Sequence, residues 1–122
     1  MLEVLLRGGV ARQIEDRIFS PAETLHAPHL LDLEVLQVLR RYTASGHMGA
    51  ERGLEAVVDL ADLPISRYPH DLLLHRIWEL RHNMTAYDAA YVALAESLSA
   101  PLLTRDKRLA ASSGHVVPVE VV

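Results

Sequence analysis

The sequence predicts an α/β domain with a mostly parallel sheet and helices on both of its faces. Short apolar runs alternate with segments of helical periodicity, and half of the 122 residues are hydrophobic. A chain of this length can bury one core, so we expect a single domain over residues 1–122. The lack of cysteine excludes disulfides, thiolate zinc sites and cysteine nucleophiles, and it fits a reducing cytoplasm.

The first half of the chain is predicted to hold one short strand among helices. After the break at Gly8 and Gly9, apolar spacing indicates a helix. Residues 24–28, TLHAP, are a strand candidate, and a helix over 29–46 follows. The inward side of that helix is expected to carry Leu31, Val35, Val38, Leu39 and Tyr42. A further helix over 48–63 is expected to place inward Ala50, Leu54, Val57 and Ala61.

In the second half of the chain, predicted strands and helices alternate more regularly. Residues 64–69 form a strand candidate between prolines, and residues 71–83 have helical periodicity. The inward side of this helix is expected to carry Leu73, Ile77 and Leu80. A helix begins after Thr85, and two short apolar runs, 100–104 and 115–122, predict the last strands. Trp78, Tyr87 and Tyr91 stand at inward helical positions and are predicted to be core residues rather than platforms for nucleic-acid bases.

The charge distribution restricts the function classes. A formal net charge of −4 argues against a protein that holds nucleic acid by general electrostatics. A local basic patch could still meet RNA, with candidates Arg40, Arg41, Arg105, Lys107 and Arg108. The charged N-terminal segment has neither a membrane span nor a signal-peptide core, so we expect a soluble protein.

Asp88 is the first carboxylate that needs an explanation. Thr85 is a good N-cap and Asp88 follows three residues later, which fits a capping arrangement. At about 100° per residue, Asp88 also points toward the packed side of its helix, where a lone carboxylate is costly. Both a cap and a ligand remain open for this residue.

Two further acidic positions raise the same question. Asp106 directly follows a predicted buried strand, where open α/β sheets gather ligands, but it could also be an N-cap for the helix at 107–111. Glu34 borders the apolar side of its helix, and Asp32 could equally compensate the helix dipole. If the fold brings three carboxylates together, they suit a hard cation such as Mg²⁺ or Mn²⁺.

Three motifs occur along the chain in the order PHLLDLEVLQVLRR, TAYDAAYVALAE and APLLTRD. By these motifs the sequence resembles the PIN-domain toxins of the VapC type. The resemblance runs from about Leu2 to Val122. It implies a three-layer α/β domain with the activity of a metal-dependent endoribonuclease. It also implies a homodimer that a VapB-type antitoxin holds inactive.

The resemblance also assigns site residues. It places the acidic pattern of the family on Glu34, rather than Asp32, and on Asp88 and Asp106, which would hold Mg²⁺ or Mn²⁺. Thr104, the hydroxyl residue before the last acidic position, would orient water or a carboxylate. Asn83 is a further candidate donor behind these ligands.

One departure from the family pattern concerns the N-terminus. Family members begin with an apolar strand that ends in an aspartate, whereas this sequence begins with what looks like the following helix, and Glu3 does not match the missing position. A start upstream of Met1, a truncated variant, or replacement by another segment or chain would each explain it. The contrasting function is therefore a non-catalytic PIN-like protein that dimerises or binds an antitoxin.

Other chemistries have little support. His26 and His29 stand three apart but flank Pro28 outside any convincing set of metal ligands. No G-x-S-x-G, Walker-type loop or dinucleotide G-x-G-x-x-G occurs in the sequence. Serine hydrolases, nucleoside triphosphatases and Rossmann oxidoreductases are therefore not indicated.

Overall fold

Strands alternate with helices in the order that the sequence predicts. The computed structural model describes residues 24–104 and 107–121. Its elements are β1 (Leu25–Pro28), α2 (Leu30–Ala44), α3 (Ala50–Asp62), β2 (Ile65–Tyr68), the 3₁₀ turn η2 (Asp71–Leu73), α4 (Leu74–Glu79), α5 (Ala86–Leu98), β3 (Leu102–Thr104), α6 (Lys107–Ala110) and β4 (Val119–Val121). The helix predicted after Gly9 and the predicted lack of a first strand concern residues outside this part of the chain.

All strand pairing within the described residues is parallel, as predicted. β1 pairs with β2 in the register Leu25 to Ile65, and β3 pairs with β4 in the register Leu102 to Val119. No ladder joins β1 to β3 in the described part of the chain, so the strands form two pairs. Helix α5 packs against both β1 and β3 and thereby connects the pairs.

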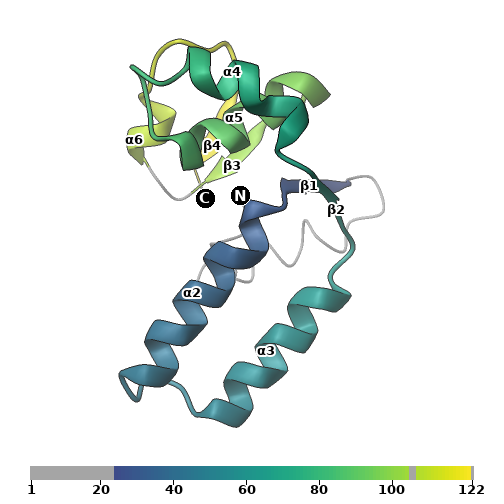
Figure 1. Ribbon diagram of the computed structural model, residues 1–122, viewed down its shortest axis with the longest axis vertical. Helices are drawn as coiled ribbons and strands as arrows, with labels where there is room; N and C mark the ends of the chain where they lie inside the picture. The colour runs from purple at the N-terminus through teal and green to yellow at the C-terminus, as the bar shows by residue number, and fades with distance from the viewer. Residues whose placement is uncertain (1–23, 105–106, 122) are drawn as a thin grey trace.

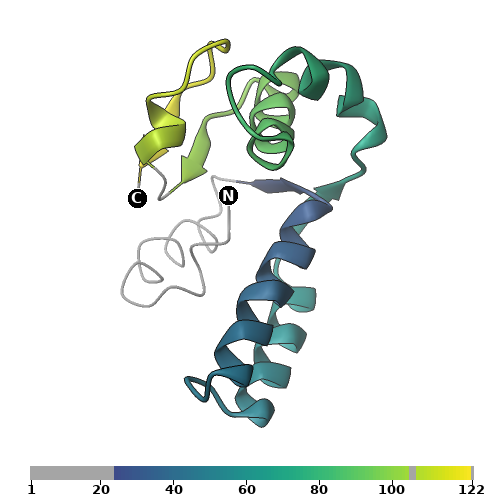
Figure 2. The same cartoon turned by 60° about the vertical axis from the view of Figure 1, so that its left-hand side comes forward.

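The helices lie in two groups around these strands. Helices α2 and α3 run side by side and extend away from β1 and β2 (Figure 1), while α4, α5 and α6 lie with β3 and β4. The same division is visible after rotation (Figure 2). No helix within residues 24–104 or 107–121 has the length and apolar character needed to cross a membrane.

The predicted inward face of α2 is largely confirmed, with Tyr42 only half-buried, whereas on α3 the prediction was wrong for all but Val57, which is half-buried against the core. Leu31, Val35, Val38 and Leu39 are buried on α2. On α3 the buried residues are Gly53, Ala56 and Leu60, whereas Leu54 is 65% exposed. A Cβ at Gly53 would lie only 3.0 Å from the Thr43 methyl group, so the small residues are what allow α3 to approach α2. The close approach of the helices, rather than the spacing of the largest apolar residues, therefore sets the inward face.

Helix α5 is the most buried helix of the described chain. Every residue from Ala89 to Ala95 is buried, because strands and α4 cover it on several sides. The predicted N-cap is confirmed: the Thr85 hydroxyl accepts a hydrogen bond of 3.2 Å from the backbone N–H of Asp88. The helix ends at Ser99, whose φ of 51° is left-handed.

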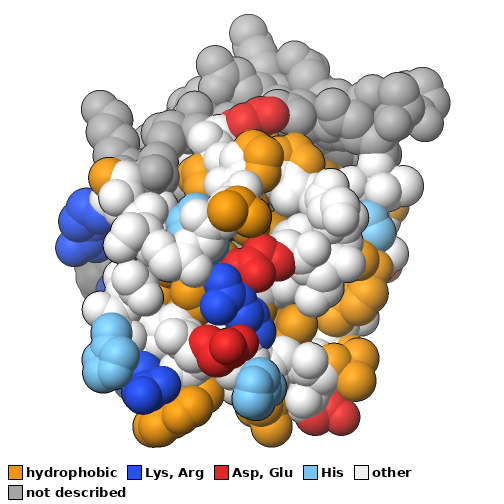
Figure 3. Space-filling model, turned by 90° about the horizontal axis from the view of Figure 1, so that it is seen from above, with side chains coloured by type: hydrophobic (Ala, Val, Ile, Leu, Met, Phe, Trp, Pro, Cys, Tyr) orange, Lys and Arg blue, Asp and Glu red, His pale blue; other side chains and the backbone are white. Residues whose placement is uncertain are grey.

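An arginine fixes α4 to α5. The Arg76 guanidinium donates to the Glu96 carboxylate at 2.9 and 3.0 Å and to the Gly114 carbonyl at 2.8 Å. The hydrogen bonds to Glu96 raise the pKa of Arg76 above its ordinary value, against the opposing effect of partial burial. Basic and acidic side chains accordingly lie against one another at the upper end of the molecule (Figure 3).

Candidate active site

Asp88 lies in the first turn of α5, where the helix enters the core. Its side chain is half-buried, and the acidic charge is favoured by the positive end of the helix dipole. The cap that the structure shows uses the Thr85 hydroxyl and the Asp88 backbone N–H. The Thr85 hydroxyl thus caps the beginning of α5, one turn before the buried part of the helix.

Glu34 is brought to the same helix by a tyrosine. It lies half-buried on α2, and the hydroxyl of Tyr91 donates a hydrogen bond to its carboxylate. Tyr91 stands three residues after Asp88, so both side chains project from the same side of α5. Carboxylates that are 54 positions apart in the sequence therefore face the same region.

Tyr91 was predicted only as a core residue, and it is indeed 4% exposed. Its hydroxyl has the additional task of fixing Glu34. The local sequence carried no signal for this bond, because Glu34 lies on another helix, 57 positions earlier in the chain.

The two acidic residues of α2 have different partners: Asp32 forms an ion pair with Arg67, whereas Glu34 accepts from Tyr91 of α5. Asp32 accepts from the Nε of Arg67 at 2.8 Å, and the same guanidinium donates to the Leu60 carbonyl at 2.8 Å. Asp32 therefore links α2 to β2, and the same arginine links β2 to the last turn of α3. This structural role leaves Glu34 as the acidic residue of α2 that reaches α5.

The remaining predicted residues lie at the end of β3. Thr104 is the last residue of this strand and is half-buried, and β3 packs against α5. Asp106 and Arg105 lie outside the described residues. Among the residues that the structure describes, no group of three or more His, Asp or Glu side chains forms a metal-binding cluster. The geometry thus unites Glu34 with the Asp88 face of α5, and Asp106 stays a prediction.

A shallow groove opens beside Glu34. Its volume is about 400 Å³, and it lies between α2 and the beginning of α5. Gln37, Arg41 and Tyr87 line it together with Glu34 and apolar side chains of α2. The groove thus contains a negative charge at Glu34, a positive charge at Arg41 and the aromatic ring of Tyr87.

The donor chemistry of this region fits a hard divalent cation. Glu34 and Asp88 would supply carboxylate oxygens, and Thr104, at the end of a strand that packs against α5, would supply a hydroxyl. Mg²⁺ and Mn²⁺ prefer such oxygen ligands and commonly use only one or two carboxylates from the protein. Asn83 has another task, because its amide donates at 3.1 Å to the Ser113 hydroxyl before β4.

The prediction that Trp78 and Tyr87 belong to the core was wrong. Their side chains are 67% and 63% exposed. Helix α4 has only six residues, and its inward face carries Ile77, which leaves Trp78 about 100° away from the buried side. Tyr87 precedes the stretch of α5 that is covered by neighbours.

Comparison with known proteins agrees with this fold. The PIN domain family model matches residues 2–113. The chain therefore belongs to the PIN-domain family.

Within that family its relatives are VapC ribonucleases of mycobacteria. Ribonuclease VapC9 of Mycobacterium tuberculosis is 44% identical over 121 residues, covering 99% of this chain and 91% of that protein. Ribonuclease VapC1 of the same organism is 50% identical over 98 residues, covering 80% and 74%. Ribonuclease VapC12 is 38% identical over 122 residues, covering 100% and 90%.

The bond between Tyr91 and Glu34 gives a first prediction. Tyr91→Phe removes the hydroxyl that orients Glu34, so we expect RNA cleavage to fall roughly tenfold while the free energy of unfolding falls by only about 1 kcal/mol. Tyr68→Phe is the matched control, because the Tyr68 hydroxyl bonds His26 at 2.7 Å. It should lower stability to a similar extent and leave the cleavage rate unchanged. Equal cleavage by the Tyr91 variant and wild type would contradict a positioning role.

Proposed function

We propose that this chain is a divalent-metal-dependent endoribonuclease and the toxin of a toxin–antitoxin module, hydrolysing RNA phosphodiester bonds. The proposal is supported by membership of the PIN-domain family and by the relatives named VapC ribonuclease. The observation that carries it to particular residues is the hydrogen bond from Tyr91 to Glu34, which joins α2 to the Asp88 face of α5. We further propose that residues 1–122 act as one PIN-like domain.

Each site residue has a proposed role. Glu34, Asp88 and Asp106 would hold Mg²⁺ or Mn²⁺, which supplies positive charge to the phosphodiester and makes water a better nucleophile. Tyr91 holds the Glu34 carboxylate toward α5, and Thr85 fixes the beginning of the helix that carries Asp88. Thr104, at the end of β3, would orient water or a carboxylate.

The proposed partners follow from the same membership. The substrate is RNA, and a VapB-type antitoxin would hold the enzyme inactive in the cytoplasm, where the RNA is found. The active form would be a homodimer. Size-exclusion chromatography with light scattering, alone and with the antitoxin from a neighbouring reading frame, measures both associations.

Cleavage of a panel of transfer and ribosomal RNAs tests the proposal. With Mg²⁺ or Mn²⁺ the purified chain is expected to cut one or a few RNAs at defined positions, and removal of the metal by EDTA should stop cleavage. Restoring either ion should restore it. A folded chain that leaves every RNA intact with both ions, or that cuts equally well in EDTA, would contradict the proposal. The first of these results would favour a non-catalytic protein that binds an antitoxin.

A further inference from the structure

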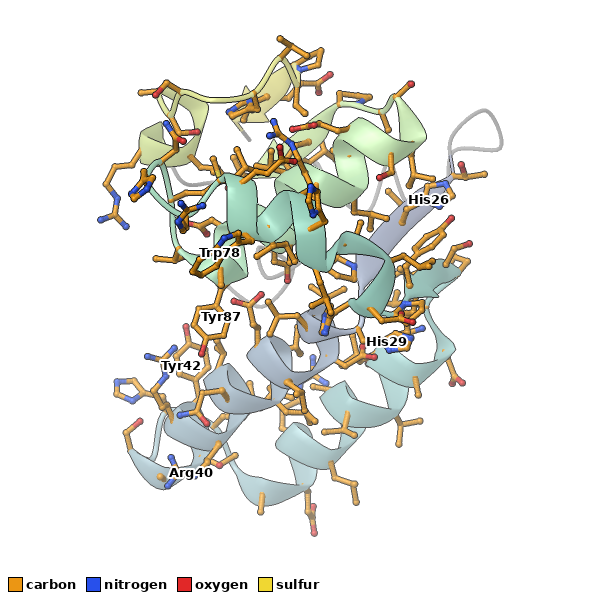
Figure 4. All side chains as sticks on the ribbon, turned by 45° about the horizontal axis from the view of Figure 1, so that its top comes forward. His26, His29, Arg40, Tyr42, Trp78 and Tyr87 are labelled. Atoms are coloured by element: carbon orange, nitrogen blue, oxygen red, sulfur yellow. The ribbon has the colours of Figure 1, made fainter. Side chains whose placement is uncertain are left out.

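We propose that Trp78 and Tyr87, with Arg81 and Arg41, form a stacking surface that binds unpaired bases of the RNA substrate beside the acidic site. The inference rests on the proposed function for the identity of the ligand. It assigns to two exposed aromatic residues a role in holding RNA, whereas the acidic residues serve the reaction. In Figure 4 the side chains of Trp78 and Tyr87 follow one another along the same side of the molecule.

The indole ring of Trp78 has the guanidinium of Arg81 over one of its two faces. The Arg81 guanidinium carbon lies 4.4 Å from the centroid of the indole, and Arg81 Nη1 donates to the Trp78 carbonyl at 2.9 Å. The Trp78 side chain is nevertheless 67% exposed, so the other face of the ring is open to solvent. The Arg76 bonds to Glu96 attach α4 to α5, which gives this platform a rigid base. A base can stack on the open face while the guanidinium contacts a phosphate.

Tyr87 extends the surface to the acidic site. It lines the groove that also contains Glu34, and Arg41 supplies a positive charge in the same groove. Tyr87 lies in the first turn of α5 and shares the groove with Glu34, so a base stacked on its ring would lie beside a carboxylate that is proposed to hold the metal. RNA held at Tyr87 would therefore present a phosphate near Glu34 and Asp88.

The charges favour RNA over an apolar peptide as the occupant. Within residues 24–104 and 107–121, neither Arg41 nor Arg81 takes part in a side-chain ion pair, in contrast to Arg76 and Arg67. Two arginines without carboxylate partners beside two exposed rings match a polyanion with stacked bases. The net charge of −4 makes such a local surface more necessary, because general electrostatics would repel RNA.

The test measures RNA binding without cleavage. Fluorescence anisotropy with a labelled single-stranded RNA would follow binding to an Asp88→Asn chain, and Trp78→Leu and Tyr87→Leu would be added to this background. We expect each leucine to weaken binding roughly tenfold, because leucine keeps apolar area but removes the ring. Trp78→Phe and Tyr87→Phe should retain most of the affinity. Leu54→Ala and Leu72→Ala, at residues 65% and 79% exposed, are the controls and should leave binding unchanged.

Either of two results would overturn the inference. One is equal RNA affinity for the leucine variants and their parent, and the other is loss of affinity for a VapB-type antitoxin with unchanged affinity for RNA. The second result would make the surface a protein-docking site. Failure of the proposed function is distinguishable, because it appears as absence of cleavage by the wild-type chain while ring-dependent RNA binding persists.

Discussion

Replacing Asp88 by asparagine is expected to lower metal-dependent RNA cleavage at least about a hundredfold, equivalent to about 2.7 kcal/mol of transition-state stabilisation. The amide keeps the shape of the side chain but removes the charge that a divalent cation requires. Stability should change by less than about 1 kcal/mol, because the Thr85 hydroxyl still caps α5 and the interaction of the charge with the helix dipole is of that size. Cleavage rates and chemical unfolding of the same preparations measure both effects.

This variant separates the two explanations that the sequence leaves open for Asp88. If Asp88 served only the helix, its substitution would lower the stability of the protein and leave the cleavage rate unchanged. Asp62→Asn is the matched control, since Asp62 is an exposed acidic residue at the end of α3, and it should change neither quantity. Wild-type cleavage by the Asp88 variant would remove this residue from the site.

Leu102→Ala should have the largest effect on stability. Leu102 is 0% exposed in the cluster that α5, β3 and α6 share, so the substitution leaves a cavity among closely packed side chains. We expect the free energy of unfolding to fall by about 2–5 kcal/mol. A domain with about 5–15 kcal/mol in total would then lose much of its stability. Urea unfolding followed by circular dichroism measures the change.

An exposed leucine provides the control for this prediction. Leu72→Ala, at a side chain 79% exposed, should change the unfolding free energy by less than about 0.5 kcal/mol. A loss below about 1 kcal/mol for Leu102→Ala would show that β3 is not packed as described. Because β3 carries Thr104 and leads to Asp106, a destabilised β3 should also reduce cleavage, and the loss should be greatest near the melting temperature of the variant.

The sequence predicted local features better than contacts between elements. The spacing of Leu31 and Val35 defined the inward face of α2, and Thr85 defined the beginning of α5. The inward face of α3 was missed, because it depends on how closely Gly53 approaches Thr43 on another helix. Such an approach has no signature in the periodicity of a single helix.

In the candidate site too, the sequence predicted local motifs better than contacts between elements. The acidic motifs pointed to Glu34 and Asp88, but periodicity could not distinguish Glu34 from Asp32. The different surroundings of the two residues depend on Arg67, which lies 35 positions after Asp32 and pairs with it only in the folded chain. The exposure of Trp78 was missed because a short α4 buries only the face of Ile77. Asp106 and the N-terminal departure from the family pattern lie outside the described residues and stay predictions.

Binding of Mn²⁺, followed by electron paramagnetic resonance, tests most directly whether Glu34 and Asp88 share one metal site. We predict that Glu34→Gln and Asp88→Asn each weaken Mn²⁺ binding at least about tenfold, and that the double variant binds little worse than either one. Circular dichroism would confirm that each variant is folded. Wild-type affinity in either the Glu34→Gln or the Asp88→Asn chain would show that the two carboxylates do not act on the same ion.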